Sequence, residues 1–303
     1  MIKYSIIIPH KNLVNLLQRC LQSIPEKDEI QIIVVDYNST PDNLSILKKY
    51  SRSNVELIYT DEDRGAGHAR NIGLKYAKGK WLLFCDADDY FNENFLKYLN
   101  RYYDSIYDVI FWGFKTVDSD TGEIKPSRVI GYDKAMNNND IDYFKYRFHG
   151  PWAKMIRKTL VDNNHITFDE TICSNDTFFS GKIGFYSKKA ILDSAQIYVT
   201  VVRQGSLVHS MNVQTLSTRI EVSLKYNKFL REIKYNKYRI NMISLIYYLR
   251  KIDKNMFFKY LKLYYKQESI YNISIDLSKS ISGLLRHLFF SKSNMRKYIE
   301  IKK

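Results

Sequence analysis

Short runs of apolar, β-branched residues alternate with helical patterns over the first 117 residues, and this alternation constrains the fold most strongly. The runs are predicted strands at residues 4–10, 30–36, 54–60, 80–86 and 108–114. Nearly continuous apolar strands separated by helices are typical of a parallel sheet that helices cover on both faces. The sequence therefore predicts an α/β fold with a mostly parallel, doubly wound sheet.

The segments between these strands predict three helices. Apolar residues over 13–24 recur at helical spacing, and Asn12 precedes them as the expected N-cap. A second helix begins near Gly67 and ends before Gly79, where a glycine in the left-handed conformation would stop it. The third covers about residues 92–103. These helices supply the crossovers that a parallel sheet needs.

Polar and acidic side chains follow three of the predicted strands. The first strand ends in Pro9-His10-Lys11, the second ends in Asp36, and Asp86, Asp88 and Asp89 lie at the end of the fourth. In parallel sheets the ligand crevice lies at the carboxyl ends of the strands, so these groups should meet at one edge. Clustered carboxylates suit Mg²⁺ or Mn²⁺ shared with a phosphate. The alternative is a solvated turn whose aspartates cap the next helix, and Asp89 fits that role best.

Six blocks of sequence, in order, resemble the family 2 glycosyltransferases, which have the GT-A fold. The blocks are SIIIPHKN, IIVVDYNST, GAGHARNIGLKYAKGKWLLFCDADD, GPWAKMIRKTL, ITFDETICSNDTFF and VRQGSL. The resemblance covers roughly residues 3 to 210. It implies transfer of a sugar from a nucleotide-sugar donor, most often a UDP-sugar, with Mn²⁺ or Mg²⁺ as cofactor. The implied acceptor is a glycan or lipid-linked saccharide in the synthesis of a bacterial surface or capsular polysaccharide.

The resemblance also implies roles for residues in the donor half. Asp36 would accept a hydrogen bond from the uracil N3–H, and Pro9 belongs to the same donor-binding group. Arg70 would approach the base or the diphosphate, since a guanidinium suits phosphate acceptors. Asp86 would contact the ribose or a metal-bound water. Asp88 would bind the metal that bridges the two phosphates.

In the acceptor half, the resemblance makes Asp176 the base that takes the proton of the acceptor hydroxyl. Asn175 stands where the family commonly has Glu. Trp152 could stack on an acceptor sugar, and Arg203 is a further candidate for acceptor or diphosphate binding. His209 is a candidate metal ligand. A single base and a direct attack imply single displacement with inversion.

Each main candidate also has a purely structural alternative at this point. Asp36 could cap a turn after its strand, and Arg70 could pair with the acidic residues at 61–63. Trp152 could belong to the core, and Asp176 could be the N-cap of the helix that follows it. The sequence leaves these alternatives open.

The positive charge of the chain is concentrated at its C-terminal end. Residues 215–303 hold 20 Lys+Arg against 6 Asp+Glu, so they account for almost all of the net charge of +15. We predict a catalytic domain over 1–214, with a nucleotide-sugar half at 1–117 and an acceptor half at 118–214. A basic, helical region follows it. Such a region could lie on an anionic membrane, bind nucleic acid, or pack as a helical subdomain with a solvated basic face, and the resemblance favours the membrane.

Other features narrow the class of protein. The N-terminal apolar run is short and interrupted by Pro9, unlike a signal peptide, and no window approaches the 18 to 20 apolar residues of a membrane span. We therefore expect a cytoplasmic protein, peripheral at most at the inner face of the cell membrane. Cys20, Cys85 and Cys173 are expected to be reduced, buried thiols.

Two other functions remain as alternatives. A sugar nucleotidyltransferase would carry a glycine-rich loop directly after the first strand, whereas IIIPHKNLVNLL contains no glycine. A nucleic-acid-binding protein acting through the basic region would bind with a steep salt dependence.

Overall fold

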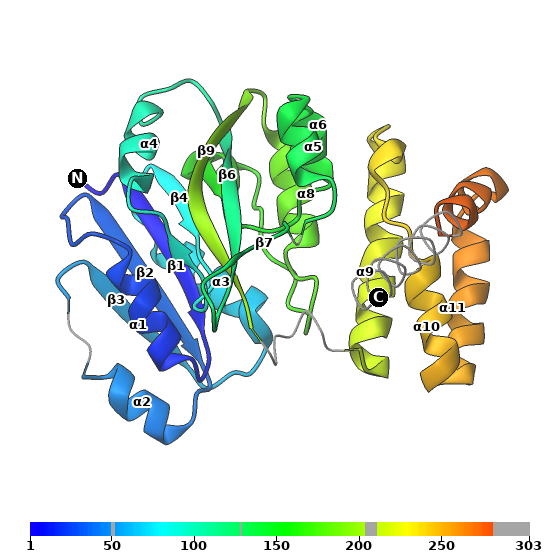
Figure 1. The fold of residues 1–303 in the computed structure, drawn as a ribbon, viewed down its shortest axis with the longest axis horizontal. Helices are drawn as coiled ribbons and strands as arrows, with labels where there is room; N and C mark the ends of the chain where they lie inside the picture. Colours follow the sequence, from blue (N-terminus) through cyan, green and yellow to red (C-terminus); the bar gives the residue numbers. More distant parts are fainter. Residues whose placement is uncertain (50–51, 128, 204–210, 281–303) are drawn as a thin grey trace, which may run out of the picture. The chain divides into compact units, whose positions relative to one another are not determined.

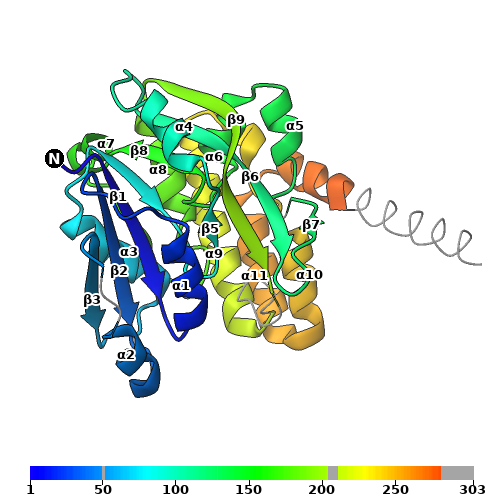
Figure 2. The same cartoon turned by 60° about the vertical axis from the view of Figure 1, so that its left-hand side comes forward.

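The computed structural model divides the chain into two compact units, residues 1–210 and 211–303 (Figures 1 and 2). The residues described are 1–49, 52–127, 129–203 and 211–280. His209, the candidate metal ligand, lies outside the described residues.

The first unit is built around one mixed β-sheet (Figure 1). Its described strands are β1 (Tyr4–His10), β2 (Ile30–Tyr37), β3 (Val55–Thr60), β4 (Trp81–Phe84), β5 (Tyr90–Phe91), β6 (Val109–Asp118), β7 (Ile124–Lys125), β8 (Lys154–Arg157) and β9 (Ala190–Val202). They are ordered β3-β2-β1-β4-β8-β6-β9-β5, and β7 pairs with β6. All five predicted strands are present, as β1, β2, β3, β4 and β6.

The predicted parallel arrangement holds for β1 to β4, but the sheet beyond them is mixed. β8 lies between β4 and β6 and is antiparallel to both. β9 is parallel to β6, and the short β5 is antiparallel to β9. The prediction of a mostly parallel sheet is nevertheless confirmed, because the long pairings are parallel and the antiparallel pairings are short. β8 is short, with Met155 and Ile156 between two basic residues, so its sequence does not have the long apolar run of a parallel strand.

Eight helices are described in the first unit. They are α1 (Val14–Gln22), α2 (Pro41–Leu47), α3 (Gly65–Tyr76), α4 (Phe95–Arg101), α5 (Tyr132–Asn137), α6 (Ile141–Tyr146), α7 (Lys158–Asn163) and α8 (Thr177–Tyr186). The three predicted helices correspond to α1, α3 and α4. Cys20 of α1 lies with its Sγ 3.4 Å from that of Cys85, and both thiols are buried and free, as expected. Cys173 is not part of a disulfide and is only partly buried.

Two predicted helix ends are wrong in their details. Asn12 is not the N-cap of α1; it has a φ of 55°, and its side-chain oxygen accepts a hydrogen bond from the Thr40 N–H at 2.8 Å. Asn12 therefore joins the loops after β1 and β2. Gly79 does not adopt the left-handed conformation. A Cβ on Gly79 would lie 2.6 Å from the backbone nitrogen of Ser5, so glycine is needed there for close approach to β1.

The second unit is helical over its described residues. It contains α9 (Val213–Glu232), a 3₁₀ turn η2 (Asn236–Tyr238), α10 (Ile243–Ile252), α11 (Lys254–Gln267) and a further helical segment over 270–280. It has its own apolar core, in which Leu216, Ile246 and Leu249 are buried. None of the described helices is long and apolar enough to cross a membrane.

Candidate functional site

A pocket of about 630 Å³ lies in the first unit where β1, β2 and β4 end. It brings together most of the predicted site residues, although they come from distant parts of the chain. Those that line it are Pro9, Arg70, Asp86, Asp88, Trp152, Asp176 and Arg203. Strand ends supply the acidic groups because parallel strands terminate at the same edge of the sheet.

Arg70 connects the two halves of this pocket. It is 6% exposed and lies on α3, and its guanidinium donates to Asp86 Oδ1 at 2.6 Å and to Asn175 Oδ1 at 3.0 Å. The alternative pairing with residues 61–63 is therefore not observed. Asn175 stands where the family commonly has Glu, and its neutral amide oxygen still accepts a hydrogen bond from Arg70. The site carries one negative charge fewer as a result.

Two arginines donate hydrogen bonds to Asp88, which lies in the loop after β4. Arg203 Nε donates to Asp88 Oδ2 at 3.0 Å, and Arg19 of α1 donates to the Asp88 backbone oxygen at 2.6 Å. The side chain of Asp88 is 22% exposed and that of Asp86 is 29% exposed. Both carboxylates thus reach the pocket while arginines balance their charge.

The ligand atoms available at this edge of the sheet suit a hard divalent cation. Asp88 and Asp86 offer carboxylate oxygens, the ligand type that Mg²⁺ and Mn²⁺ prefer. Among the described residues, no three His, Cys, Asp or Glu side chains are grouped as a ready-made metal site. A metal here would therefore take ligands from the diphosphate as well, which agrees with a cation that binds together with the donor.

Asp36 occupies a different position from the one expected of a residue that touches the base. It is 2% exposed and does not line the pocket, and its oxygens accept from the Ser39 N–H at 3.1 Å, the Ser39 hydroxyl at 2.6 Å and His10 Nδ1 at 2.7 Å. Burial raises the pKa of Asp36, but these hydrogen bonds outweigh burial and keep the pKa below its ordinary value. The structural alternative, a carboxylate that closes the turn after β2, describes these contacts.

His10 is expected from the sequence only as a polar residue at the end of the first strand, yet it shapes this end of β1. Its Nε2 accepts from the Leu13 N–H at 3.1 Å, so that nitrogen carries no proton and Nδ1 donates to Asp36. The buried ring thus has a hydrogen-bond partner at each of its two nitrogens. It couples the start of α1 to the end of β2.

Asp89 does not line the pocket and is not the N-cap of α4. It is 1% exposed, and its carboxylate accepts from the Tyr198 hydroxyl at 2.9 Å and the Val201 N–H at 2.8 Å. The same Tyr198 oxygen accepts from the Asp86 N–H at 3.1 Å. Asp89 therefore attaches the acidic loop to β9, and α4 begins six residues later, at Phe95.

Asp176 stands at the start of α8 without capping it. Its side chain makes no capping hydrogen bond to the helix and faces the pocket. Burial raises the pKa of Asp176, while the Arg70 guanidinium acts in the opposite direction. A carboxylate that is partly withdrawn from water and not used by the helix is suited to accept a proton.

Trp152 lines the pocket but is mostly part of an aromatic cluster. It is 5% exposed, stacks on Tyr198 with ring centroids 5.4 Å apart, and meets Phe114 and Phe148 edge to face. Little of its surface is left for an acceptor sugar to contact. The core role and a pocket-lining role are therefore combined in one side chain.

Lys154 is a buried cation that sequence reasoning did not single out. It is 1% exposed, and its Nζ donates to the Phe148 carbonyl at 2.8 Å and to Ser180 Oγ at 2.9 Å. These bonds join the loop beside Trp152 to α8, the helix that follows Asp176. Burial lowers the pKa of Lys154 to about 7, although Asp176 acts to raise it.

This lysine predicts a distinctive pH dependence of stability. The folded pKa of about 7 lies below the ordinary value of 10.5. Between these values the unfolded chain binds more protons than the folded chain, so the free energy of unfolding should rise with pH, at up to about 1.4 kcal/mol per pH unit. Lys154→Met should lose this contribution.

Urea unfolding of both proteins from pH 6 to pH 9.5 would measure the difference. Lys158→Met, a change at a partly exposed lysine on α7, is the matched control and should keep the slope of the unchanged protein. Equal slopes for Lys154→Met and the unchanged protein would show that Lys154 does not titrate in this range.

Comparison with known proteins agrees with this geometry. Residues 5–164, more than half of the chain, match the family described as Glycosyl transferase family 2. The chain belongs to this family. Its relatives include a poly(ribitol-phosphate) beta-glucosyltransferase of Bacillus spizizenii, 31% identical over 217 residues, which are 67% of this chain and 32% of the relative. Another is the poly(ribitol-phosphate) beta-N-acetylglucosaminyltransferase TarS of Staphylococcus aureus, 29% identical over 222 residues, which are 70% of this chain and 38% of the relative.

A solved structure supports the fold assignment. The crystal structure of S. aureus TarS 1-349 in complex with UDP-GlcNAc superposes with a TM-score of 0.63 at 25% identity, covering 85% of this chain and 73% of that one. The predicted GT-A fold is thereby confirmed. This chain spans only about a third of the length of the two full relatives.

Proposed function

We propose that this family 2 protein is an inverting, metal-dependent glycosyltransferase that moves a sugar from a UDP-sugar to a glycan or lipid-linked saccharide in bacterial surface polysaccharide synthesis. The observation that carries the proposal is the single pocket that holds Asp86, Asp88, Arg70 and Asp176. Family membership favours sugar transfer over a sugar nucleotidyltransferase. The poly(ribitol-phosphate) acceptors in the relatives' names support a surface polymer as acceptor.

In the proposed reaction, Asp176 accepts the proton of the acceptor hydroxyl as its oxygen attacks the anomeric carbon. The bond from that carbon to the β-phosphate oxygen breaks, and UDP leaves with the bonding electrons. A single displacement inverts the anomeric centre. Arg70 holds Asp86 in place and joins the donor side to the segment that carries Asp176.

A Mn²⁺ or Mg²⁺ ion bound with the donor would act as a Lewis acid on the departing diphosphate. Asp88 is the proposed protein ligand, with Asp86 beside it. Arg203 is proposed to contact the diphosphate or an acceptor, which its contact with Asp88 in the pocket supports. Pro9 lines the donor side.

Calorimetry with a panel of nucleotides, with and without Mn²⁺, tests the donor assignment. We expect UDP to bind more tightly than other nucleotides and more tightly with the metal. Metal-dependent release of UDP across a panel of UDP-sugars would then identify the sugar. UDP binding that is indifferent to Mn²⁺ would contradict the assignment.

We further propose that the basic second unit contacts an anionic membrane at its inner face, where lipid-linked acceptors would be found. Its described residues, 211–280, hold 14 Lys+Arg against 5 Asp+Glu. Cations near a membrane surface are attracted to anionic lipid head groups. Sedimentation of the full chain with anionic vesicles tests this contact.

A further inference from the structure

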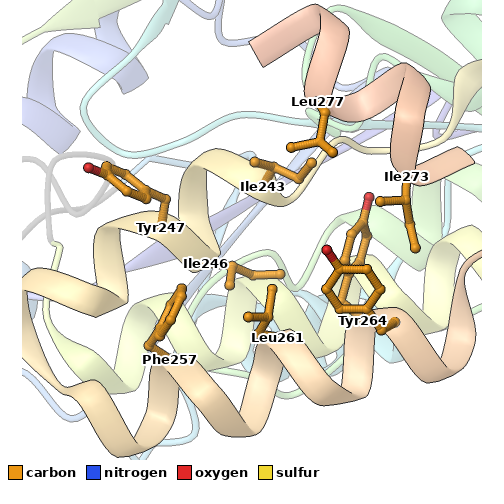
Figure 3. Close-up of a pocket in the computed structure, with 9 residues that line it drawn as sticks. Ile243, Ile246, Tyr247, Phe257, Leu261, Tyr264, Ile273 and Leu277 are labelled. Atoms are coloured by element: carbon orange, nitrogen blue, oxygen red, sulfur yellow. The ribbon is translucent and has the colours of Figure 1, made fainter. Parts of the chain in front are cut away.

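The second unit contains an apolar pocket that no part of the proposed reaction uses. It lies among α10, α11 and the helical segment 270–280, and Figure 3 shows side chains of all three pointing toward one another. Its lining is entirely aliphatic or aromatic: Ile243, Ile246, Tyr247, Phe257, Leu261, Tyr264, Tyr265, Ile273 and Leu277. Three of these residues carry hydroxyls, but that of Tyr264 already donates to Asp276 at 2.6 Å, so the lining is predominantly apolar.

The size of the pocket defines what it can hold. Its volume is about 160 Å³. An apolar cavity of about 150 Å³ stays dry and accepts a molecule the size of benzene. The pocket therefore matches a segment of hydrocarbon about six carbons long. Tyr247 and Tyr265, which are 54% and 57% exposed, make the opening accessible from outside the unit.

The surroundings of the pocket are basic and partly apolar. Six cations on α10 and α11 are exposed: Arg250, Lys251, Lys254, Lys259, Lys262 and Lys266. The only carboxylate on these two helices and the residue between them is Asp253, which accepts from the Met256 N–H as the N-cap of α11. Phe258 is 64% exposed among these lysines. The mixture of exposed cations and exposed aromatic rings is typical of a surface that lies on lipid head groups.

The other carboxylates of the unit do little to offset this charge. Glu268 and Asp276 are buried in ion pairs with Arg231 and Arg239. Glu221 accepts from the Tyr260 hydroxyl at 2.6 Å. Glu221 and Glu232 are exposed, but both lie on α9, where Glu232 is 4.0 Å from Lys228. Exposed cations therefore dominate the described surface of α10 and α11.

We propose that this pocket binds a hydrocarbon chain of an anionic membrane lipid. The apolar lining accommodates the chain, and the surrounding cations attract the head group. A second copy of this chain is a poorer occupant, because it would bring two strongly basic surfaces together. A nucleic acid would satisfy the cations but not the aliphatic lining. The inference deepens the proposed membrane contact and is independent of sugar transfer.

A tryptophan placed in the pocket provides the test. All three tryptophans of the chain, Trp81, Trp112 and Trp152, are buried in the first unit, so Phe257→Trp adds a distinct reporter. The full chain is mixed with vesicles of phosphatidylcholine and phosphatidylglycerol whose acyl chains are brominated or unmodified. We expect bromine to quench the Phe257→Trp signal. The same change at Lys228, whose side chain on α9 is 71% exposed and does not line the pocket, should give little quenching.

A second experiment narrows the pocket. Leu261→Phe keeps every charge but reduces the space, and we expect partitioning into anionic vesicles to fall about tenfold, the effect of losing a few buried methylene groups. Helical content and UDP binding should not change. Partitioning equal to that of the unchanged protein would contradict the inference.

The outcomes separate the two proposals. Sedimentation with anionic but not with purely zwitterionic vesicles, together with quenching at position 257, supports both. Sedimentation without quenching would mean that head groups alone are bound, which overturns the pocket assignment and retains the membrane contact. A full chain that does not sediment with anionic vesicles, and binds single-stranded DNA instead, would overturn both.

Discussion

Asp176→Asn is expected to reduce sugar transfer by about a thousandfold while UDP binding is unchanged, since a positioned base commonly contributes a factor of 10² to 10⁴. The amide has nearly the shape of the carboxylate but cannot accept the acceptor's proton. Asp176 faces the pocket and makes no capping hydrogen bond to α8, so the helix should remain intact. Initial rates of UDP release with acceptor present, and calorimetry with UDP, measure the two effects.

The pH dependence of the same step follows from the environment of Asp176. Burial raises the pKa of this carboxyl above its ordinary value of 3.8. The base works only when deprotonated, so the rate should fall as the pH drops through the raised pKa, at a higher pH than for an exposed aspartate. Asp162→Asn, at a half-exposed carboxylate paired with Lys158, is the control and should keep normal rates. Substantial turnover by Asp176→Asn would remove Asp176 as the base.

Asp88→Ala is expected to abolish the gain in UDP affinity that Mn²⁺ provides, and with it nearly all transfer. Metal stabilisation of a departing phosphate group contributes several kcal/mol, so a loss of at least about a hundredfold in rate should follow. Without metal, UDP binding should not weaken, because the change frees the Arg203 guanidinium that now lies 3.0 Å from Asp88. Calorimetry with UDP in the presence of Mn²⁺ or of a chelator distinguishes the two conditions.

Asp104→Ala is the matched control for this change, since the Asp104 side chain is 84% exposed and pairs only with Lys80 among the contacts described. Both nucleotide affinities should be normal in that variant. If Asp88→Ala weakened UDP binding equally with and without Mn²⁺, Asp88 would be a structural residue of the loop and not a metal ligand.

Much of the donor half could be predicted because its signals are local. The apolar runs at 4–10 and 30–36 appear as β1 and β2 within one residue of their expected bounds. Two of the three acidic residues after β4, Asp86 and Asp88, line the pocket because the ends of parallel strands must meet. Their individual roles could not be read in the same way, since Asp88 reaches the pocket whereas its neighbour Asp89 is buried against β9.

The sequence by itself determined the α/β architecture, the concentration of positive charge beyond residue 214 and the family, because periodicity, composition and motif order are properties of the chain alone. Tertiary structure decided which groups touch. Arg70 reaches Asn175 across 105 residues, Asp36 turns inward to His10, and Lys154 is buried beside α8. These contacts depend on where β8, β9 and α8 pack. Burial then shifts the pKa of the ionisable groups, and a local sequence pattern does not contain this information.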